Sequence, residues 1–365
     1  MATPAKAAQI DAFACPQCNA PQTFEPGTSR LVCDHCGNAV QIVLETNAIP
    51  THDLFGKTAI AALRASEIST GTREIECKQC GAHAIVTRRA ERCAFCDAPM
   101  VVEVDRGDTT IPPGGVLPFV VDGKAAAQKF AGWLSGRWFA PSDLVARSRR
   151  DRLDGVYLPF WTFDVDSTTQ YDGQRGTVHT TTETYTDASG KEQTRTVETV
   201  DWTPVSGTVT CSQKDVLTAG SPTLPAKLVA KLEPWELPKA RAFDPRFLAG
   251  FSAERYKVQP ADGFTAAYPI IEAHIKSRIC SDIGGDRQQV DSMNVAWNAV
   301  GFRHLLLPVW LSSFRYNDKV FHVTVNAATG EVAGERPWSA VKIILFVLAI
   351  AIVVAGIAVL VAKYR

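Results

Sequence analysis

The chain has 365 residues, of which 46% are hydrophobic, so it can form about two to three folding units with ordinary cores. Its 38 lysines and arginines balance 38 aspartates and glutamates, and the formal net charge at pH 7 is zero. A neutral chain has no overall field that attracts nucleic acid. This excludes the class of proteins that bind nucleic acid through a large net positive charge.

Eight of the ten cysteines lie in four C-x-x-C pairs near the N-terminus. They form two sets of four, with 14 residues between the pairs of the first set and 12 between those of the second. This spacing is close to that of zinc ribbons, in which four thiolates hold one tetrahedral ion. We therefore expect two structural Zn²⁺ sites. The expected metal ligands are Cys15, Cys18, Cys33, Cys36, Cys77, Cys80, Cys93 and Cys96.

The residue after each second cysteine also fits a zinc knuckle. These residues are Asn19, Gly37, Gly81 and Asp97, the types that best tolerate a positive φ. Two alternatives stay open: four disulfides, and knuckles paired in an interleaved order. Disulfides are disfavoured because Met1–Ala14 has no apolar signal-peptide core, and interleaving is disfavoured because it closes longer loops.

Helices and boundaries are expected next along the chain. Residues 49–70 are predicted to link the ribbons through a helix over residues 52–65, and the Pro/Gly-rich run at 105–115 marks a boundary. Asp122 is expected to cap a helix with aromatic residues on one side, and a second short helix is expected near Ser142.

The following part of the chain is rich in β-branched residues. Helices are predicted over residues 225–232 and 260–283, the second interrupted or kinked by Pro269 and ended by two glycines. This pattern indicates an α+β fold with mostly antiparallel strands. The expected strands cover residues 156–165, 177–186, 192–200, 288–297, 303–314 and 320–325.

The C-terminal part contains 20 residues, 343–362, without a charged or polar side chain. A helix of this length spans about 30 Å, the thickness of a bilayer core. Lys342 and Trp338 precede it and Lys363 follows it, as expected at a membrane interface. We expect a single-pass anchor rather than a buried helix, which would keep a polar face. Because zinc thiolates need a reducing compartment, the preceding residues are expected in the cytoplasm.

The predicted domain plan follows from these features. It comprises a flexible tail (1–10), zinc ribbon 1 (11–48), a linker helix (49–70), zinc ribbon 2 (71–105), an α+β body (106–338) and a transmembrane anchor (339–365).

Catalysis and nucleic-acid binding find little support. The sequence contains no G-x-S-x-G, H-E-x-x-H or G-x-G-x-x-G motif, so no catalytic residue is predicted and the chain is not expected to be an enzyme. Residues 1–50 carry two basic and four acidic side chains, and residues 71–106 carry six of each. That balance is poor for binding phosphates.

The two remaining cysteines, Cys211 and Cys280, are expected to be small apolar packing residues.

Several segments together resemble a bacterial family of TFIIB-type zinc-ribbon membrane proteins. They are the two ribbons, the Leu-Pro-Phe-Trp and Leu-Pro-Val-Trp segments at 158–161 and 307–310, and the Val-Asn-x-x-Thr-Gly and Gly-Glu-x-Pro segments at 325–330 and 334–337. The chain departs from the family pattern at Ala327, where glycine is usual. Members often carry a primosomal protein N′ helicase label, which does not fit here because the nucleotide motif of the motor is absent.

The resemblance implies phage-shock-protein-A-like or flotillin-like partners in a membrane-stress system. Combined with the two metal sites and the membrane span, it leads to one interpretation: a cytoplasmic zinc-ribbon adaptor, anchored in the bacterial cell membrane by its C-terminal helix, that recruits soluble proteins. The alternatives are a membrane-tethered nucleic-acid-binding protein and a thiol-redox or chaperone module that uses the C-x-x-C pairs.

Overall fold

The computed structural model describes residues 13–43, 48–56, 73–86, 93–96, 98, 102–103, 111–139, 141, 153–186, 188, 190–316 and 319–364. The predicted tail at 1–10, most of the predicted linker helix, the predicted helix near Ser142 and the knuckle residue Asp97 lie outside these ranges.

The first cysteine set is built on a small antiparallel sheet of three strands. They are β1 (Gln22–Phe24), β2 (Arg30–Cys33) and β3 (Ala39–Gln41), in that order. Gly27, with φ of 78°, supplies the left-handed residue of the turn between β1 and β2. The expected knuckle–hairpin–knuckle arrangement is therefore present in this segment.

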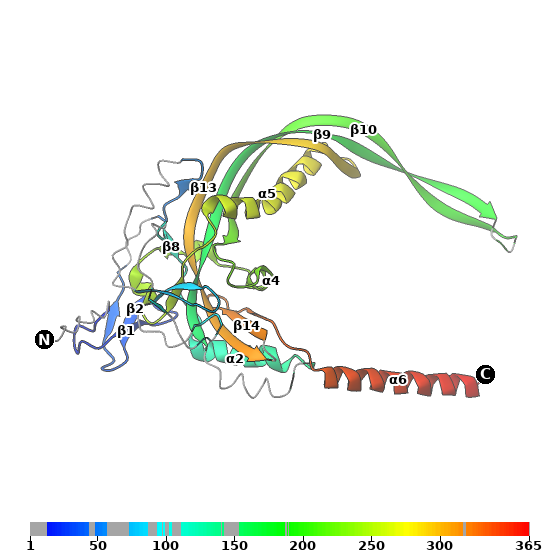
Figure 1. Cartoon of the computed structure of the whole chain (residues 1–365). Helices are drawn as coiled ribbons and strands as arrows, with labels where there is room; N and C mark the ends of the chain where they lie inside the picture. The colour runs from blue at the N-terminus through cyan, green and yellow to red at the C-terminus, as the bar shows by residue number, and fades with distance from the viewer. Residues whose placement is uncertain are drawn as a thin grey trace.

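The rest of the α+β fold is organised around three long strands, β9 (Asp154–Thr186), β10 (Glu192–Ala219) and β13 (Arg287–Tyr316). In the described residues they belong to one 12-stranded sheet, and β9 lies antiparallel between β10 and β13 (Figure 1). The expected mostly antiparallel α+β class is confirmed. The shorter strands are β4 (His52–Asp53), β5 (Arg73–Glu76), β6 (His83–Val86), β7 (Val102–Glu103), β8 (Gly115–Val116), β11 (Arg241–Ala242), β12 (Ser252–Glu254), β14 (Lys319–Asn326) and β15 (Val332–Gly334).

Helix α5 (Pro260–Ile283) packs along the three long strands and has the predicted bounds. Ile271, Ile275, Ile279 and Ile283 recur every fourth residue, lie on one face of the helix and are buried in the core. Pro269 lies within the helix without ending it. The remaining helices are α2 (Gly123–Ser135), α4 (Ala226–Ala230), α6 (Ala340–Lys363) and the 3-10 turns η1 (Leu237–Lys239) and η2 (Pro245–Leu248).

Three expectations about elements are wrong. The two strands expected at 156–165 and 177–186 are one strand, β9, which runs without a break from Asp154 to Thr186. The helix expected from His52 begins instead as strand β4, which pairs with Gly301 and Phe302 of β13. The two strands expected at 288–297 and 303–314 are one strand, because pairing with β9 continues across a bulge after Trp297. Gly301 lets the segment before β4 approach β13 closely, since a Cβ at this position would lie 2.6 Å from the Thr51 side chain.

Beyond the three-stranded region, β9 and β10 continue as a two-stranded arm. Pairing of β13 with β9 ends at Gly176. Beyond that residue, in the part of the chain that the structure describes, β9 pairs only with β10, as far as Thr186, which lies opposite Glu192. The side chains of this extension are exposed on both faces. Figure 1 shows it projecting far from the core of the molecule. We call residues 177–201 the arm.

Candidate metal centres

The first four cysteines converge at one end of the small sheet. The two C-x-x-C knuckles place all four Sγ atoms within 4.8 Å of one another. Across the pair of knuckles, the Cys15 and Cys36 sulfurs are 3.6 Å apart and those of Cys18 and Cys33 are 3.5 Å apart. Each knuckle thus contributes two sulfurs to one compact group.

The second set repeats this geometry on β5 and β6. Its four Sγ atoms also lie within 4.8 Å of one another. The Cys77 and Cys96 sulfurs are 3.5 Å apart, and those of Cys80 and Cys93 are 3.7 Å apart. The knuckles pair in the sequential order expected from loop closure, and the interleaved alternative is not what the structure shows.

These sulfur positions fit a tetrahedral metal ion. With Zn–S bonds of about 2.3 Å, the sulfurs of a regular tetrahedron lie about 3.8 Å apart, close to the separations in both groups. A disulfide would need about 2.05 Å, and all eight cysteines are free thiols. Both groups can therefore bind a metal ion with four soft ligands and no open position.

The local backbone explains why these sequences form knuckles. The N–H of the residue after each C-x-x-C donates to the first cysteine's carbonyl at 2.9 Å for Asn19, 3.0 Å for Gly37 and 2.7 Å for Gly81. These three residues have φ of 60°, 72° and 67°, which confirms the positive φ predicted for them. The turn aims the following N–H groups at the sulfurs, as with the Gln17 N–H, which lies 3.4 Å from the Cys15 sulfur.

The knuckle N–H groups also favour thiolate at the first cysteine of each set. Burial acts to raise the pKa of Cys15, but hydrogen bonds from the Gln17 and Cys18 N–H groups outweigh it and lower that pKa to about 6. At Cys77 burial opposes the same kind of backbone donation, and the pKa falls to about 7. Thiolate is the form that binds metal.

The second centre is part of the main core. Strand β6 pairs with β12, so the second ribbon extends the large sheet. Cys77, Cys93 and Cys96 are buried in one cluster with Leu158 and Trp235. The sequence did not predict this attachment.

Polar contacts also hold the last knuckle of the second centre. The Ser313 hydroxyl donates to the Ala94 carbonyl at 2.8 Å, and the His322 Nε2 donates to the Phe95 carbonyl at 2.8 Å. Both donors come from strands β13 and β14, more than 200 residues further along the chain. The knuckle is thus fixed to the body as well as to its own hairpin.

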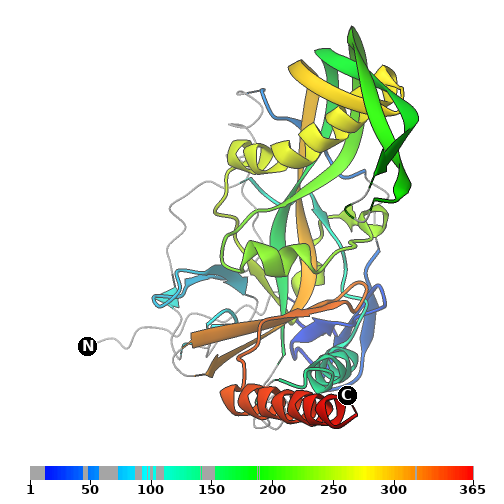
Figure 2. The same cartoon turned by 90° about the vertical axis from the view of Figure 1, so that its right-hand side faces the viewer.

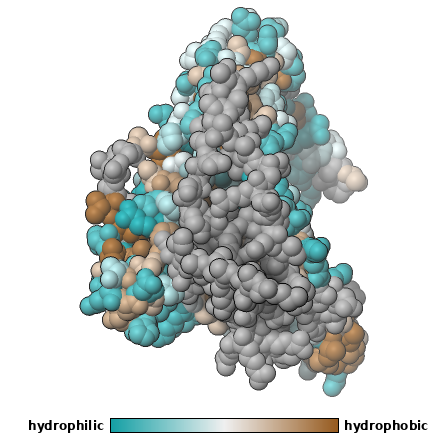
Figure 3. Space-filling view, turned by 60° about the vertical axis from the view of Figure 1, so that its left-hand side comes forward, coloured by the Kyte–Doolittle hydropathy of each residue, from teal (hydrophilic) through white to brown (hydrophobic). Residues whose placement is uncertain are grey.

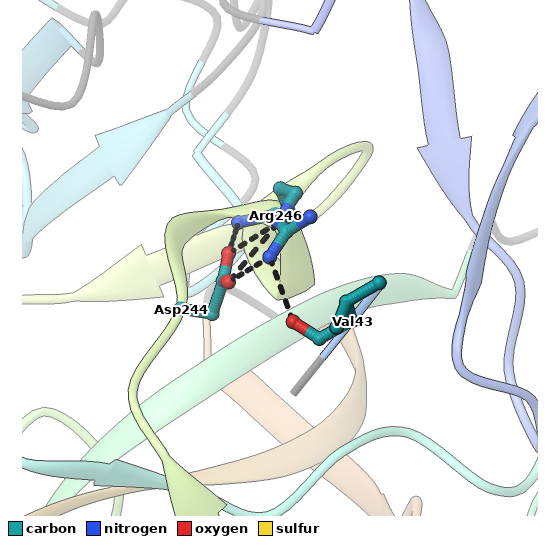
Figure 4. Close-up of polar contacts among 3 residues, drawn as sticks. All are labelled: Val43, Asp244 and Arg246. Carbon is teal, nitrogen blue, oxygen red and sulfur yellow. Dashed lines mark hydrogen bonds and ion pairs between the residues drawn. The ribbon is translucent and has the colours of Figure 1, made fainter. Parts of the chain in front are cut away.

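The first centre is attached through its hairpin. Phe24 is buried against Phe247, with ring centroids 5.1 Å apart, and its N–H donates to the Ala249 carbonyl. Arg246 forms a bidentate ion pair with Asp244. The same guanidinium donates to the carbonyl of Val43, at the end of the first ribbon, at 3.3 Å (Figure 4). The Arg246 guanidinium, acting against burial, holds the pKa of Asp244 below its ordinary value.

Helix α6 contrasts with these packed elements. Within the described residues it is the one helix long and apolar enough to cross a membrane: it has 24 residues, and the mean hydropathy of an 18-residue stretch within it is 3.3. None of its residues is buried, and its side chains form the brown patch at the lower right of Figure 3. The Ser339 hydroxyl accepts from the Lys342 N–H and caps its first turn.

The remaining cysteines lie away from the two centres. Cys211 is buried on β10 and Cys280 is half-buried on α5, which agrees with their expected packing role. Sequence reasoning missed a group of cations at the base of α6, because Arg137, Lys231, Lys319 and Arg336 come from four separate segments and form no motif.

Comparison with known proteins finds one informative similarity. Over 335 residues the chain is 27% identical to the "Uncharacterized protein YdjG" of Bacillus subtilis (strain 168), covering 92% of each chain. The two are distant homologues. No protein family description and no solved structure matches the chain. The similarity extends over most of the chain, and membership of the zinc-ribbon family stays a prediction.

Proposed function

We propose that this protein is a membrane-anchored adaptor: two structural zinc centres brace a cytoplasmic α+β body that recruits soluble partner proteins to the bacterial cell membrane. The observation that carries the proposal is α6, an apolar helix without a buried residue that is joined to a well-packed body. In water this exposed surface would be strongly unfavourable, whereas a bilayer accommodates it.

The metal centres support a structural role. Four cysteines fill every position of a tetrahedral ion, so neither water nor substrate has a place on the metal. Zinc suits this donor set because it prefers tetrahedral thiolate coordination. Thiolates of this kind persist in a reducing compartment, which supports the cytoplasmic side of the membrane.

The arm supports recruitment. In the described residues β10 pairs only with β9, which leaves its outer edge without a strand partner along its length. An open edge can add a strand from another protein through main-chain hydrogen bonds. By resemblance, the partners are phage-shock-protein-A-like or flotillin-like proteins.

Membrane attachment is tested by vesicle flotation. The full chain, reconstituted with phosphatidylcholine vesicles, should float with them, and a variant that lacks residues 340–365 should stay in the soluble fraction. Flotation of both variants, or of neither, would contradict the anchor.

Recruitment is tested by crosslinking in intact membranes followed by affinity capture. The full chain should capture specific proteins, and a variant with a shortened arm should lose at least some of them. Tight DNA binding that weakens steeply with salt would instead favour the nucleic-acid alternative.

A further inference from the structure

A pocket of about 530 Å³ lies at the base of α6. It opens between the end of α2, strand β14, the end of β15 and the residues that lead into α6, elements that Figure 2 shows together at the lower end of the molecule. Its size is in the range of small-ligand sites. Its lining residues include Trp133, Arg137, Lys231, Lys319, Arg336 and Trp338.

The pocket is strongly cationic. Four of its lining residues are lysine or arginine, and the one acidic lining residue is Glu335, whose carboxylate is 3.7 Å from the His322 Nδ1. Lys231, Lys319 and Arg137 are exposed, so their charges can reach a ligand in the pocket. Such an excess of positive charge in a concave site favours an anion.

Two of the cations, Arg336 and Arg137, lie over aromatic rings. The Arg336 guanidinium carbon lies 4.4 Å from the centroid of Trp338, and that of Arg137 lies 4.8 Å from the centroid of Trp133. Among the described residues, the Arg336 Nη1 is buried and has no hydrogen-bond partner. A buried charged donor without an acceptor is unfavourable, and an anion in the pocket would supply the acceptor.

The pocket also lies where the apolar helix begins. Trp338 comes directly before the Ser339 cap and is 63% exposed, and Trp138 is 74% exposed. The Ser339 N–H donates to the Phe139 carbonyl at 2.8 Å, and the Phe139 ring contacts Phe346 of α6 with centroids 5.4 Å apart. Exposed tryptophans beside the end of a spanning helix are typical of the headgroup level.

We propose that this pocket binds the phosphate of an anionic phospholipid headgroup. The inference rests on the proposed membrane anchor, because α6 would bring the pocket to the height of lipid phosphates. A lipid is favoured over free phosphate because exposed aromatic side chains border the cations and give the rest of the lipid an apolar contact.

Binding is tested with the full chain in neutral detergent and soluble short-chain lipids, so that the readout does not depend on insertion. Short-chain phosphatidylglycerol, short-chain phosphatidylcholine and inorganic phosphate are titrated separately by calorimetry. Phosphatidylglycerol should bind at least about tenfold more tightly than the other two, as expected for charge-assisted hydrogen bonds with added apolar contact.

Two pocket variants and one control assign the site. Arg336→Gln and Lys319→Gln should each weaken phosphatidylglycerol binding by about tenfold. Lys214→Gln removes one charge from an exposed position of β10 outside the pocket and should change nothing. Because Lys319 is exposed, its variant tests the site even if Arg336→Gln disturbs folding.

Three results would overturn the inference: equal affinity for the two lipids, equal affinity of both pocket variants and the control, or competition by inorganic phosphate at the same concentration as the lipid. The last would assign the site to free phosphate. Failure of the anchor is seen separately, as loss of flotation on phosphatidylcholine vesicles.

Discussion

Two buried ionisable side chains have pKa values shifted in opposite directions. Burial raises the pKa of Glu254 from 4.5 to about 7, although the Ser221 hydroxyl donates to its carboxylate at 2.6 Å. Burial lowers the pKa of His304 from 6.5 to about 4, although its Nδ1 donates to the Ile111 carbonyl at 3.0 Å. In the folded chain Glu254 is therefore protonated below about pH 7, and His304 is neutral above about pH 4. Between these two pH values both side chains are uncharged.

The two groups have opposite effects on stability. The contribution of Glu254 is fully present below pH 4.5 and is lost as pH rises toward 7, because the unfolded chain ionises first. The contribution of His304 is fully present above pH 6.5 and is lost as pH falls toward 4. Between these limits their slopes cancel.

Glu254→Gln should therefore expose the slope of His304. Relative to the unmodified chain, the free energy of unfolding of this variant should rise with pH between 4.5 and 6.5, by about 1.4 kcal/mol per pH unit. Urea unfolding of the full chain in detergent at several pH values measures this. The exposed carboxylate variant Glu192→Gln is the matched control, and a parallel pH profile for both variants would contradict the assignment.

The cysteine ligands can be tested by metal content. Cys36→Ser and Cys80→Ser each replace an exposed member of one group and should lower bound zinc from two ions per chain to one. Cys280→Ser should keep both ions, because it lies outside the groups. Elemental analysis of purified protein gives the count, and two ions in either ligand variant would remove that cysteine from its site.

At this scale the sequence was informative where the signal is local. The sign of φ at Asn19, Gly37 and Gly81 follows from residue type and the adjacent C-x-x-C pair. The burial of Glu254 could not be predicted in that way, because its partner Ser221 lies 33 residues away. A short strand such as β12 gives no sign that its carboxylate will be buried beside the Ser221 hydroxyl.

Among the elements, the arm is the clearest candidate for removal. The described residues of the arm belong to none of the four core clusters, and Val178 pairs with Val200 at its base. Replacing residues 179–199 by Asn-Gly should close the hairpin with a two-residue turn. The free energy of unfolding should change by no more than about 0.5 kcal/mol, as for surface changes remote from packing.

Thermal and urea unfolding of the full-length and shortened chains measure this difference. A similar shortening of α5, which carries the buried isoleucines, should be strongly destabilising and serves as the contrast. A large loss of stability in the arm variant would show that the arm is a structural element and would weaken the case for it as a recruitment surface.

Element bounds were predictable where both ends carry a local signal. Helix α5 begins at Pro260 and ends before Gly284, a residue with φ of 65°, and both signals are visible in the sequence. Strand β13 was not predictable as one element, because its continuity depends on pairing with β9, more than 100 residues earlier. Strand β4 was missed because it has only two residues, which are too few to show the alternating pattern of a strand.

For the whole molecule, the two metal centres belong to the cores that fold the body. The second group shares a cluster with residues of β9 and β13, and the hairpin of the first group packs with Phe119 and Tyr157 in another. Neither attachment could be predicted, since β6 and β12 are about 170 residues apart in the sequence. The α+β class and the apolar helix were predictable because they follow from composition and periodicity.

This arrangement predicts that metal and fold are lost together. Chelation of zinc from the full chain should produce a single unfolding transition that includes the body, because metal-linked folding energy of roughly 10–16 kcal/mol per site exceeds the stability of a typical domain. Circular dichroism during chelator titration, followed with metal release, tests this. Release of both ions without loss of body structure would contradict the prediction.

The burial of the second centre has a kinetic consequence. Cys77, Cys93 and Cys96 are buried and only Cys80 is exposed, so three of the four sulfurs are shielded from a competing ligand. A chelator should reach the ion only when β5 and β6 separate from β12. The rate of metal release from this site should then equal the rate at which this part of the sheet opens. The exchange rate of isotopically labelled zinc at the second centre should therefore measure the rate of this local opening.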